Sequence, residues 1–204
     1  MKIGIIVQAR MSSQRLPNKV LTKVKGKPLL QYLLERLNNC SSIDQIIVAT
    51  SNEKSDDSIA LFCEEYGAKF FRGPLENVAK RFMMVIEEYK LDAFVRICGD
   101  SPLLDQQLID QGLKLFNSGF DLVTNVQPRS YPLGQSVEIV KSDTFKGIFE
   151  KMSKISDFEH VTKYFYDHPD KFKIKNFSNI PNLSDYSLVV DTPLDLKNIE
   201  KIIN

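Results

Sequence analysis

Short apolar runs alternate with segments of helical periodicity along this chain. A short apolar run between polar loops is typical of a strand buried on both faces of a parallel sheet. Alternation of such strands with amphipathic helices predicts an α/β protein: an open, mostly parallel, doubly wound sheet with helices on both faces. A small antiparallel extension is expected at 172–177, where polar and apolar residues alternate as in a half-exposed edge strand. The expected strands are residues 3–7, 43–49, 68–71, 93–97, 121–123, 136–140 and 188–190, and the expected helices are 28–37, 55–66, 78–90, 104–117, 142–152, 157–166 and a last one that begins at Pro193.

The loop after the first expected strand carries three cations. Arg10, Arg15 and Lys19 follow the strand closely, with Ser12 and Ser13 between the first two. Guanidinium, ammonium, hydroxyl and free backbone N–H groups together suit a polyanion such as a triphosphate. The alternative is that these residues are ordinary solvated loop cations. Their place beyond a buried strand favours a binding role, because open α/β sheets bind ligands at the carboxyl ends of their strands.

Two aspartates follow later strands in the same way. Asp100 comes after the strand at 93–97, and Asp191 comes after the strand at 188–190. Mg²⁺ binds one or two protein carboxylates and keeps phosphate oxygens and water as its other ligands, so both residues are candidate magnesium ligands. We expect the two carboxylates to meet the cations of the first loop along one edge of the sheet. Neighbouring polar residues are explained as helix N-terminal residues, namely Asp105 and the group Thr192, Pro193 and Asp195.

Length and charge limit the remaining possibilities. The 204 residues fit one domain, which we expect to span 1–204. Lys and Arg number 27 against 26 Asp and Glu, for a net charge of +1, which argues against a nucleic-acid or anionic-membrane surface. Apolar runs are too short to span a membrane and no signal peptide precedes the first strand, so we expect a cytoplasmic protein. Three cysteines without a C-x-x-C pair argue against a disulfide framework and a zinc site.

Three segments resemble the signatures of one enzyme family. Residues 8–21, Q-A-R-M-S-S-Q-R-L-P-N-K-V-L, resemble the pattern Q-A-R-M-G-S-T-R-L-P-G-K-V-L of sugar cytidylyltransferases, most closely the spore-coat polysaccharide cytidylyltransferase-like branch related to CMP-Kdo and CMP-sialic acid synthetases. Residues 96–105, R-I-C-G-D-S-P-L-L-D, resemble the family's R-x-x-G-D-x-P-L-I-D, and residues 190–196, V-D-T-P-L-D-L, resemble its V-D-T-P-E-D-L. The resemblance implies one nucleotidyltransferase domain with a fold like that of nucleotide-diphospho-sugar transferases.

The resemblance also implies roles for individual residues. It gives catalytic roles to Arg10, Lys19 and Asp100, and magnesium ligation to Asp100 and Asp191. Two shorter matches, R-G-P-L-E-N-V at 72–78 and Y-P-L-G-Q-S-V-E at 131–138, add residues on the nucleotide and acceptor sides. The expected nucleotide-binding residues are Gln8, Ala9, Arg10, Met11, Ser12, Ser13, Arg15, Lys19, Thr50, Ser51, Arg72, Asn77, Arg96, Gly99 and Asp100. The expected acceptor-binding residues are Asn125, Tyr131, Glu138 and His160.

Several positions depart from the family pattern or have a simpler explanation. Ser12 and Asn18 stand where the family usually has glycine; Asn tolerates a left-handed backbone, whereas Ser12 would not suit a positive φ. Ser136 replaces an aspartate on the acceptor side, so the contact of that carboxylate is in doubt. Without the resemblance, Glu138 would be an exposed side chain on a strand, and His160 would be a structural residue of an amphipathic helix.

The implied function is Mg²⁺-dependent transfer of CMP from CTP to a sugar or sugar acid, such as a nonulosonic or Kdo-like acid, with release of pyrophosphate, for surface polysaccharide biosynthesis. We expect a homodimer, with residues 125–180 as the acceptor-side and dimerisation subregion. Two alternatives stay open: a glycosyltransferase with a nucleotide-sugar donor, and a non-catalytic nucleotide-binding protein. The first usually has a D-x-D-like motif in mid-chain, which is absent, and the second would be expected to lack one of the two aspartates. Neither G-x-G-x-x-G nor the P-loop motif occurs.

Overall fold

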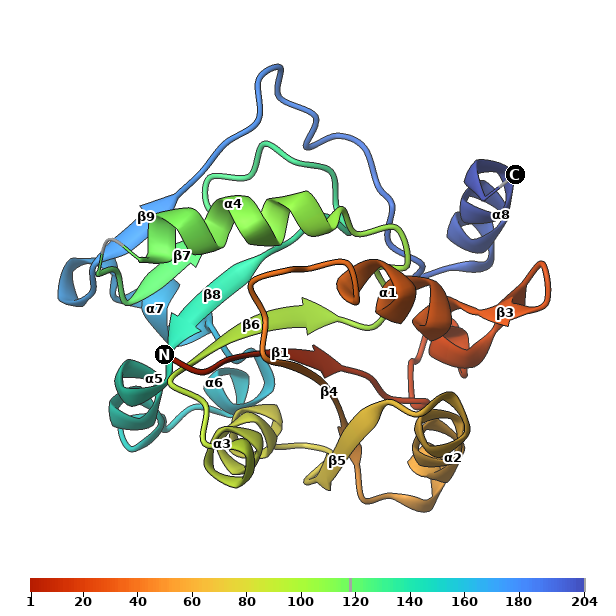
Figure 1. Cartoon of the computed structure of the whole chain (residues 1–204), viewed down its shortest axis with the longest axis horizontal. Coiled ribbons are helices and arrows are strands. Elements are labelled where there is room, and N and C mark those ends of the chain that lie inside the picture. The colour runs from red at the N-terminus through yellow and green to blue at the C-terminus, as the bar shows by residue number, and fades with distance from the viewer. Residues whose placement is uncertain (118, 204) are drawn as a thin grey trace.

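A seven-stranded, mostly parallel sheet forms the centre of the computed structural model, which describes residues 1–117 and 119–203 (Figure 1). The strand order is β5-β4-β1-β6-β8-β7-β9, and β8 alone runs antiparallel to its neighbours in this sheet. The predicted α/β class with a mostly parallel sheet is confirmed. The strands are β1 Ile3–Gln8, β4 Gln45–Ser51, β5 Lys69–Gly73, β6 Ala93–Cys98, β7 Leu122–Thr124, β8 Glu138–Lys141 and β9 Ile174–Asn176.

Helices cover both faces of the sheet and enclose two apolar cores. On one face α1, α2 and α4 pack over β1 and β6 through the first core, and on the other face α3, α5 and α7 pack through the second. Helical spacing of the leucines explains α1, in which Leu30, Leu33 and Leu37 are all fully buried. The α-helices are α1 Leu29–Leu37, α2 Asp57–Tyr66, α3 Val78–Tyr89, α4 Gln106–Phe116, α5 Ser142–Phe149, α6 Ile155–Glu159, α7 Lys163–Asp167 and α8 Pro193–Ile202. Short 3-10 helices lie at Lys19–Leu21, Lys54–Asp56 and Pro169–Lys171.

The order of the strands fixes where a ligand can bind. From β1 the chain proceeds to β4 and β5 on one side, and then returns to β6 on the other side of β1. The two neighbouring strands β1 and β6 therefore send their following loops in opposite directions, which opens a crevice at their carboxyl ends. The loops that carry Arg10 and Asp100 begin at this crevice.

The predicted strand at 188–190 is wrong. This segment belongs to neither sheet, and the Val190 amide donates to the Asp100 carbonyl oxygen at 2.9 Å. Leu133 and Ser187 form an isolated bridge just before it, and Gly134 makes room, because a Cβ there would lie 2.7 Å from the Leu188 carbonyl carbon. The segment thus docks on loops instead of adding a strand.

Three further predictions need correction. The strand expected at 172–177 lies at the sheet edge as β9, but it runs parallel to β7. The small antiparallel element is instead the hairpin of β2 Lys23–Val24 and β3 Lys27–Pro28, whose turn residues Lys25 and Gly26 both have positive φ. The helix expected at 157–166 is divided into α6 and α7, which are separated by residues 160–162.

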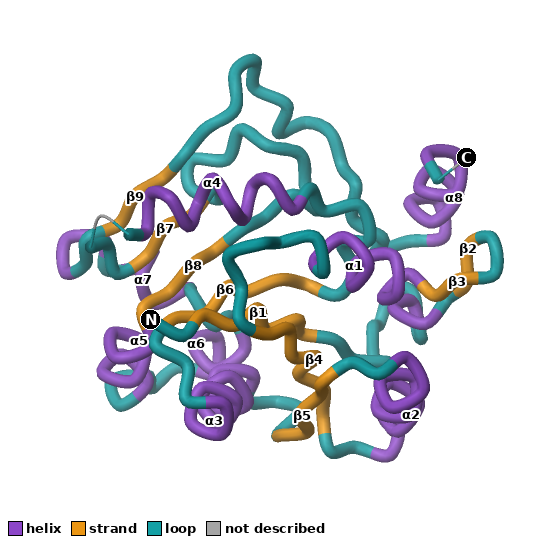
Figure 2. The backbone as a smooth tube through the Cα atoms, in the orientation of Figure 1, coloured by secondary structure: helices purple, strands orange, loops and turns teal. Residues whose placement is uncertain are grey.

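The C-terminal part of the chain returns to the front of the sheet. Two long loops, 125–137 and 177–192, run beside each other (Figure 2), joined by the Leu183 amide, which donates to the Ser130 carbonyl oxygen at 2.8 Å. After them, α8 packs near α1 and the hairpin in a small third core that includes Leu29, Val190 and Ile199. Among the described residues, no helix combines the length and apolarity that a membrane span requires.

Candidate active site

A cavity of about 460 Å³ lies at the carboxyl ends of β1 and β6, where the fold predicts a ligand site. Its wall comes from the loop after β1, the loop after β6, the N-terminal part of α3, the end of α6 and the segment before α8. Eight of the predicted nucleotide-binding residues line it, together with His160 and Asp191. These eight are Gln8, Ala9, Arg10, Ser13, Arg15, Lys19, Gly99 and Asp100.

Lys19 joins the two predicted metal ligands. Its Nζ donates to Asp100 Oδ2 at 2.7 Å and to Asp191 Oδ1 at 2.6 Å, and the residue is only 8% exposed. Burial lowers the pKa of this ammonium, but the charge of Asp100 and the hydrogen bonds to both carboxylates outweigh burial and raise it above its ordinary value. The ammonium is therefore firmly protonated, and it holds two carboxylates from distant parts of the chain around one positive charge.

Hydrogen bonds on either side of Asp191 fix its position. The preceding Val190 is bonded to the backbone of Asp100, and Arg15 Nη2 donates to Asp191 Oδ2 at 2.7 Å. On the other side, Thr192 and Asp195 form the predicted capping box of α8, and Asp195 Oδ2 also accepts from the Asp191 amide at 3.1 Å. The predicted N-terminal capping of α8 is confirmed, and the Asp191 carboxylate takes no part in it.

A buried carboxylate, Asp56, fixes the loop after β1. It is fully buried; Oδ1 accepts from the Met11 amide at 2.8 Å, and Oδ2 accepts from Thr50 Oγ1 and the Ser51 amide at 3.0 Å. This single residue ties the cation-bearing loop to the end of β4. Within the same loop Asn18 takes a left-handed conformation with φ of 63°, which asparagine tolerates, whereas Ser12 has no positive φ.

A buried ionic network contacts the wall of the cavity through Gln8. Arg96 donates through Nε to Gln8 Oε1 at 3.0 Å and through Nη1 to Glu138 Oε2, and Tyr166 donates to Glu138 Oε1 at 2.6 Å. Glu138 is 2% exposed, so the expectation that it would be exposed without a ligand role is wrong. Burial raises the pKa of the Tyr166 phenol, and the Glu138 carboxylate raises it further.

Seven predicted nucleotide-binding residues do not line the cavity. Thr50, Ser51 and Met11 are bonded to Asp56, and Arg96 lies in the buried ionic network. Arg72 is used elsewhere, since it donates to the Ser51 and Glu53 carbonyl oxygens and pairs with Asp57 at 2.7 Å. Asn77 caps α3 by accepting from the Lys80 amide at 2.7 Å. Ser12 is exposed outside the cavity.

Of the four predicted acceptor-binding residues, only His160 reaches the cavity. Asn125 is fully buried and bonds to the backbone of Gln135 and Val137. Tyr131 is 9% exposed and packs against Phe177. Glu138 has both oxygens engaged. These three residues make contacts within the protein, and none of them lines the cavity.

Six cavity residues were not predicted. Arg81 had the clearest signal, because it falls on the apolar stripe of α3 with Val78, Phe82 and Val85, where an arginine needs an explanation. Cys98 was not predicted either, and it stands at the end of β6 beside the cavity. The six are Gln14, Val20, Val78, Arg81, Cys98 and Glu159.

The carboxylate pair fits a divalent cation of the magnesium type. Asp100 and Asp191 each place one oxygen on the same ammonium, so their oxygens already converge on a single cation. Among the described residues there is no group of three or more His, Cys, Asp or Glu side chains suited to a metal, which argues against a site made by protein ligands alone. A magnesium ion that takes two carboxylates and completes its shell with phosphate oxygens and water needs no such group.

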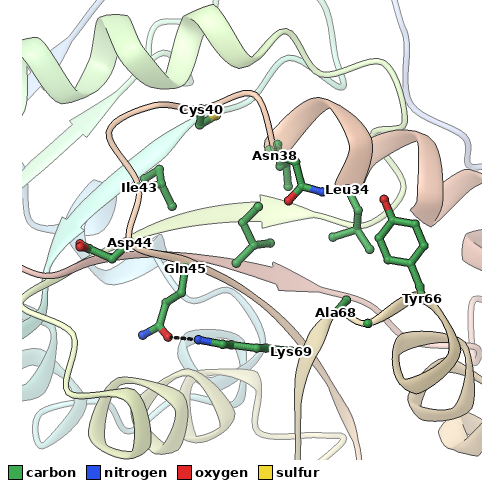
Figure 3. Close-up of a pocket in the computed structure, with 12 residues that line it drawn as sticks. Leu34, Asn38, Cys40, Ile43, Asp44, Gln45, Tyr66, Ala68 and Lys69 are labelled. Carbon is green, nitrogen blue, oxygen red and sulfur yellow. Dashed lines mark hydrogen bonds between the residues drawn. The ribbon is translucent and has the colours of Figure 1, made fainter.

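A second cavity of about 600 Å³ lies at the opposite ends of the strands, beside the amino ends of β4 and β5 (Figure 3). Its charged and polar groups are used within the protein, since Lys69 donates to Gln45 Oε1 at 2.9 Å and Asp44 Oδ2 accepts from the Ile3 amide at 2.6 Å. None of the predicted site residues lines it. The cavity at the carboxyl ends of β1 and β6 is therefore the candidate active site.

The mostly parallel sheet, the crevice between β1 and β6 and the mixed lining of cations and carboxylates suit the binding of a nucleotide. A family model described as cytidylyltransferase matches residues 4–203, and the chain belongs to this family. Its enzymes transfer a cytidylyl group, so the predicted enzyme class is confirmed. This membership supports the cytidylyltransferase interpretation over the glycosyltransferase and non-catalytic alternatives.

Individual relatives agree with the family. The chain is 32% identical to the spore coat polysaccharide biosynthesis protein SpsF of Bacillus subtilis over 209 residues, which cover 98% of this chain and 85% of SpsF. The solved structure of a cytidylyltransferase from Leptospira borgpetersenii has a TM-score of 0.95 at 30% identity and covers 100% of this chain and 87% of its own. The structure of CMP:2-keto-3-deoxy-manno-octonic acid synthetase in complex with CTP has a TM-score of 0.77 at 16% identity, with coverage of 100% and 98%, and so shares the fold.

Proposed function

We propose that this protein transfers CMP from CTP to a sugar or sugar-acid acceptor and releases pyrophosphate, as a step in the synthesis of a surface polysaccharide. The observation that carries the proposal is the meeting of Lys19, Asp100 and Asp191 at the switch point of the sheet. The acceptor class is supported by SpsF, whose name places it in spore coat polysaccharide biosynthesis, and by the synthetase of similar fold that acts on a keto-deoxy sugar acid.

In the proposed reaction a hydroxyl oxygen of the acceptor attacks the α-phosphorus of CTP. A bond forms between these two atoms, the bond from the α-phosphorus to the bridging oxygen breaks, and its electron pair leaves with pyrophosphate. The proton of the acceptor hydroxyl passes to solvent water. The developing charge needs electrostatic stabilisation more than covalent help. Arg10, Arg15 and Lys19 supply it, since all three line the cavity from one loop. His160, which lines the cavity just after α6, is the residue that we assign to the acceptor.

Asp100 and Asp191 would hold the Mg²⁺ ion. When bound, the ion supplies Lewis acidity that neutralises phosphate charge and lowers the repulsion met by the attacking oxygen. Lys19 balances the two carboxylates in the protein alone, where each accepts one of its N–H groups. With an ion on the carboxylates, Lys19 would be able to donate to a phosphate oxygen.

The test is pyrophosphate release by Asp100→Asn. We expect this variant to lose about a hundredfold or more in rate, the usual effect of removing one electrostatic group from a phosphoryl-transfer site. The matched control is Asp105→Asn in the same motif, because Asp105 caps α4 and asparagine caps a helix equally well. Near-normal turnover by D100N would contradict the assignment. Assays of four nucleoside triphosphates against sugar acids and phosphorylated polyols would then identify the substrates.

The proposal extends to a cytoplasmic homodimer, with residues 125–180 as the acceptor-side and dimer subregion. Support comes from β9, which is the last strand of the sheet and leaves one edge unpaired among the described residues. Sedimentation analysis of the whole chain tests this point. A monomer at all concentrations used in the activity assay would contradict the dimer without affecting the proposed chemistry.

A further inference from the structure

The side-chain amide of Gln8 connects the cavity with the buried network of Arg96, Glu138 and Tyr166. Gln8 ends β1, is half-buried and lines the cavity. Its Oε1 accepts a hydrogen bond from Arg96 Nε at 3.0 Å. A guanidinium group has donors and no acceptor, so the oxygen of the amide must face Arg96 and the nitrogen must face away from it. The network therefore sets the orientation of the Gln8 amide.

The Nε2 group of Gln8 is available to a ligand. It has no hydrogen-bond partner among the described residues, and it is not one of the unpaired side-chain atoms there that are closed to solvent. The network that orients it is buried, since Glu138 is 2% exposed and Arg96 donates through Nη1 to Glu138 and through Nη2 to Cys98 Sγ at 3.9 Å. A buried ion pair adds little stability compared with apolar packing, so its position behind a cavity residue fits a role in holding that residue.

The polar lining of the cavity divides into charged and uncharged residues. The charged residues are Arg10, Arg15, Lys19, Arg81, Asp100, Glu159 and Asp191. The cations among them suit the oxygens of a triphosphate, which carry full charges, whereas an amide N–H suits an uncharged oxygen. The uncharged polar residues are Gln8, Ser13, Gln14, Cys98 and His160. Because Ser13 and Gln14 belong to the loop of the cations, Gln8, Cys98 and His160 remain for the uncharged groups of a substrate.

The network runs from Gln8 towards the segment that carries His160. It crosses the sheet from β1 to Arg96 on β6 and Glu138 on β8, and it reaches Tyr166 on α7. His160 lies between α6 and α7. Among the described residues, no hydrogen bond joins the network to a cation of the loop after β1. Gln8 is therefore tied to the side of the cavity that we assign to the acceptor.

Resting on the proposed function, we propose that Gln8 is a specificity-determining residue for the acceptor. Its Nε2 group donates to an uncharged oxygen of the acceptor sugar, and Arg96 is the positioning residue that holds the amide in this orientation. Gln8, which the resemblance implied for the nucleotide, thus serves the acceptor. Glu138, which the resemblance implied for the acceptor, does not line the cavity and acts on the acceptor through Arg96 and Gln8.

Gln8→Glu reverses the polarity of the group that the acceptor meets. One carboxylate oxygen can stay on Arg96, whereas the other replaces a donor by an acceptor. In the pyrophosphate-release assay, KM for the sugar that the wild type uses best should rise about tenfold or more. The matched control is Gln14→Glu, which adds the same charge to the same cavity from an exposed position. Q14E should change KM for CTP as much as Q8E does and keep the wild-type KM for the sugar.

A second pair of variants tests the positioning role. Arg96→Lys keeps a positive charge beside Glu138 but loses the planar fork that binds Gln8 and Glu138 together. KM for the sugar should therefore rise in R96K, with KM for CTP unchanged. Tyr166→Phe removes a donor to Glu138 and leaves the bond between Arg96 and Gln8 in place, so it should keep the wild-type KM for the sugar. Equal rises in R96K and Y166F would show that the network has a structural role alone.

Binding measurements keep the outcomes apart. An unchanged KM for the sugar in Q8E would overturn the proposal, and Gln8→Met, which removes the donor without adding a charge, gives the same comparison if Q8E does not fold. In calorimetric titrations with CTP, a larger loss of affinity in Q8E than in Q14E would place Gln8 on the nucleotide and also overturn it. If no sugar releases pyrophosphate with the wild type, the proposed function fails, and equal CTP affinities of Q8E and Q14E still support a Gln8 amide directed away from the nucleotide.

Discussion

Asp100 and Asp191 accept hydrogen bonds from the same Lys19 ammonium group, at 2.7 and 2.6 Å, although one follows β6 and the other precedes α8. Without a cation between them, the two carboxylates would repel each other at close range. The lysine therefore has a structural task in addition to the electrostatic task that we assign to it in catalysis. This double use makes Lys19 the most informative residue to replace.

Lys19→Met should lower the free energy of unfolding by about 2 kcal/mol, because it leaves two partly buried carboxylates without their shared cation. The raised pKa of Lys19 sets the pH dependence. A raised pKa in the folded state gives a stabilisation that is complete below the unfolded pKa of about 10.4 and is lost as the pH rises through the folded value. Urea unfolding should therefore show a constant difference between the two proteins from pH 7 to 9, which shrinks only in more alkaline solution.

Lys27→Met is the control for this measurement. Lys27 pairs with Glu35 at 3.0 Å on the surface, where 47% of its side chain is exposed. Exposed pairs contribute little to stability, so K27M should unfold at the same urea concentration as the wild type. Equal stability of K19M and K27M would show that the Lys19 pairs do not hold the site together.

Substitutions at Asp191 and at Asp195 should have different effects, one on catalysis and the other on stability. Asp191→Asn should lose a hundredfold or more of pyrophosphate release, since it removes one carboxylate of the proposed ion site. Asp195→Ala removes the capping box of α8, which should cost about 1 kcal/mol and lower the melting temperature by about 3 °C. Thermal melting and turnover are measured on both variants. A melting temperature that falls more in D191N than in D195A would contradict this division.

The charge of Asp195 adds a pH dependence at the acid end. Burial raises its pKa, but the hydrogen bonds from Thr192 and the Asp191 amide outweigh burial and lower it. A lowered pKa gives a stabilisation that is present above the unfolded value of about 3.9 and is lost as the pH falls through the folded value. The stability difference between wild type and D195A should therefore persist at pH 5 and decrease below pH 4.

Asp56→Asn should destabilise the protein by about 3 kcal/mol. Asp56 now accepts hydrogen bonds from three buried donors. The side-chain NH2 group of asparagine would face at least one of these donors and leave that donor without an acceptor. Chemical unfolding measures the loss, and faster hydrogen exchange of the Met11 amide would locate it in the loop. The neighbouring Asp57→Asn, at an exposed position, should leave both quantities near wild type. A normal exchange rate at Met11 in D56N would contradict the tethering role.

Glu138→Gln should be costly because it leaves Arg96 buried without its counter-charge, a change typically worth about 3 to 5 kcal/mol. Tyr166→Phe removes only one donor to the same carboxylate, so about 1 kcal/mol is expected. The double variant should lose less than the sum, because both changes act on one network. Urea unfolding of the four proteins gives this coupling, and strict additivity would argue that the network does not act as a unit.

Much of the sheet could be predicted from the sequence, because β1, β4 and β6 are buried on both faces and read as continuous apolar runs. The segment at 188–190 has the same composition, but its partners are loops, and apolar composition cannot distinguish docking on loops from pairing in a sheet. The hairpin at 23–28 was not predicted because it contains no apolar run. Its strands are two residues long and each begins with a lysine, although Lys25-Gly26 between them is a turn signal that could have been used.

The charged residues of the cavity that lie in loops could be predicted from the sequence. Arg10, Lys19 and Asp100, which follow strands, lie in one cavity with Asp191, which follows a segment docked on loops. Buried polar residues were harder to interpret, since burial depends on partners that are distant in the sequence. Glu138 needs Arg96 and Tyr166 to be tolerated in the interior, and Arg81 looks like a helix residue until the cavity beside it is known.

The backbone hydrogen bond from Val190 to Asp100 has a consequence for biogenesis. During synthesis on the ribosome the sheet strands β1 to β9 emerge first, so most of the interior can fold while the nascent chain is still attached. The Asp191 carboxylate can join Asp100 and Lys19 only after the segment before α8 has left the exit tunnel. Ribosome-bound intermediates that lack this segment should therefore be compact but catalytically silent, and activity should appear only after the segment has emerged.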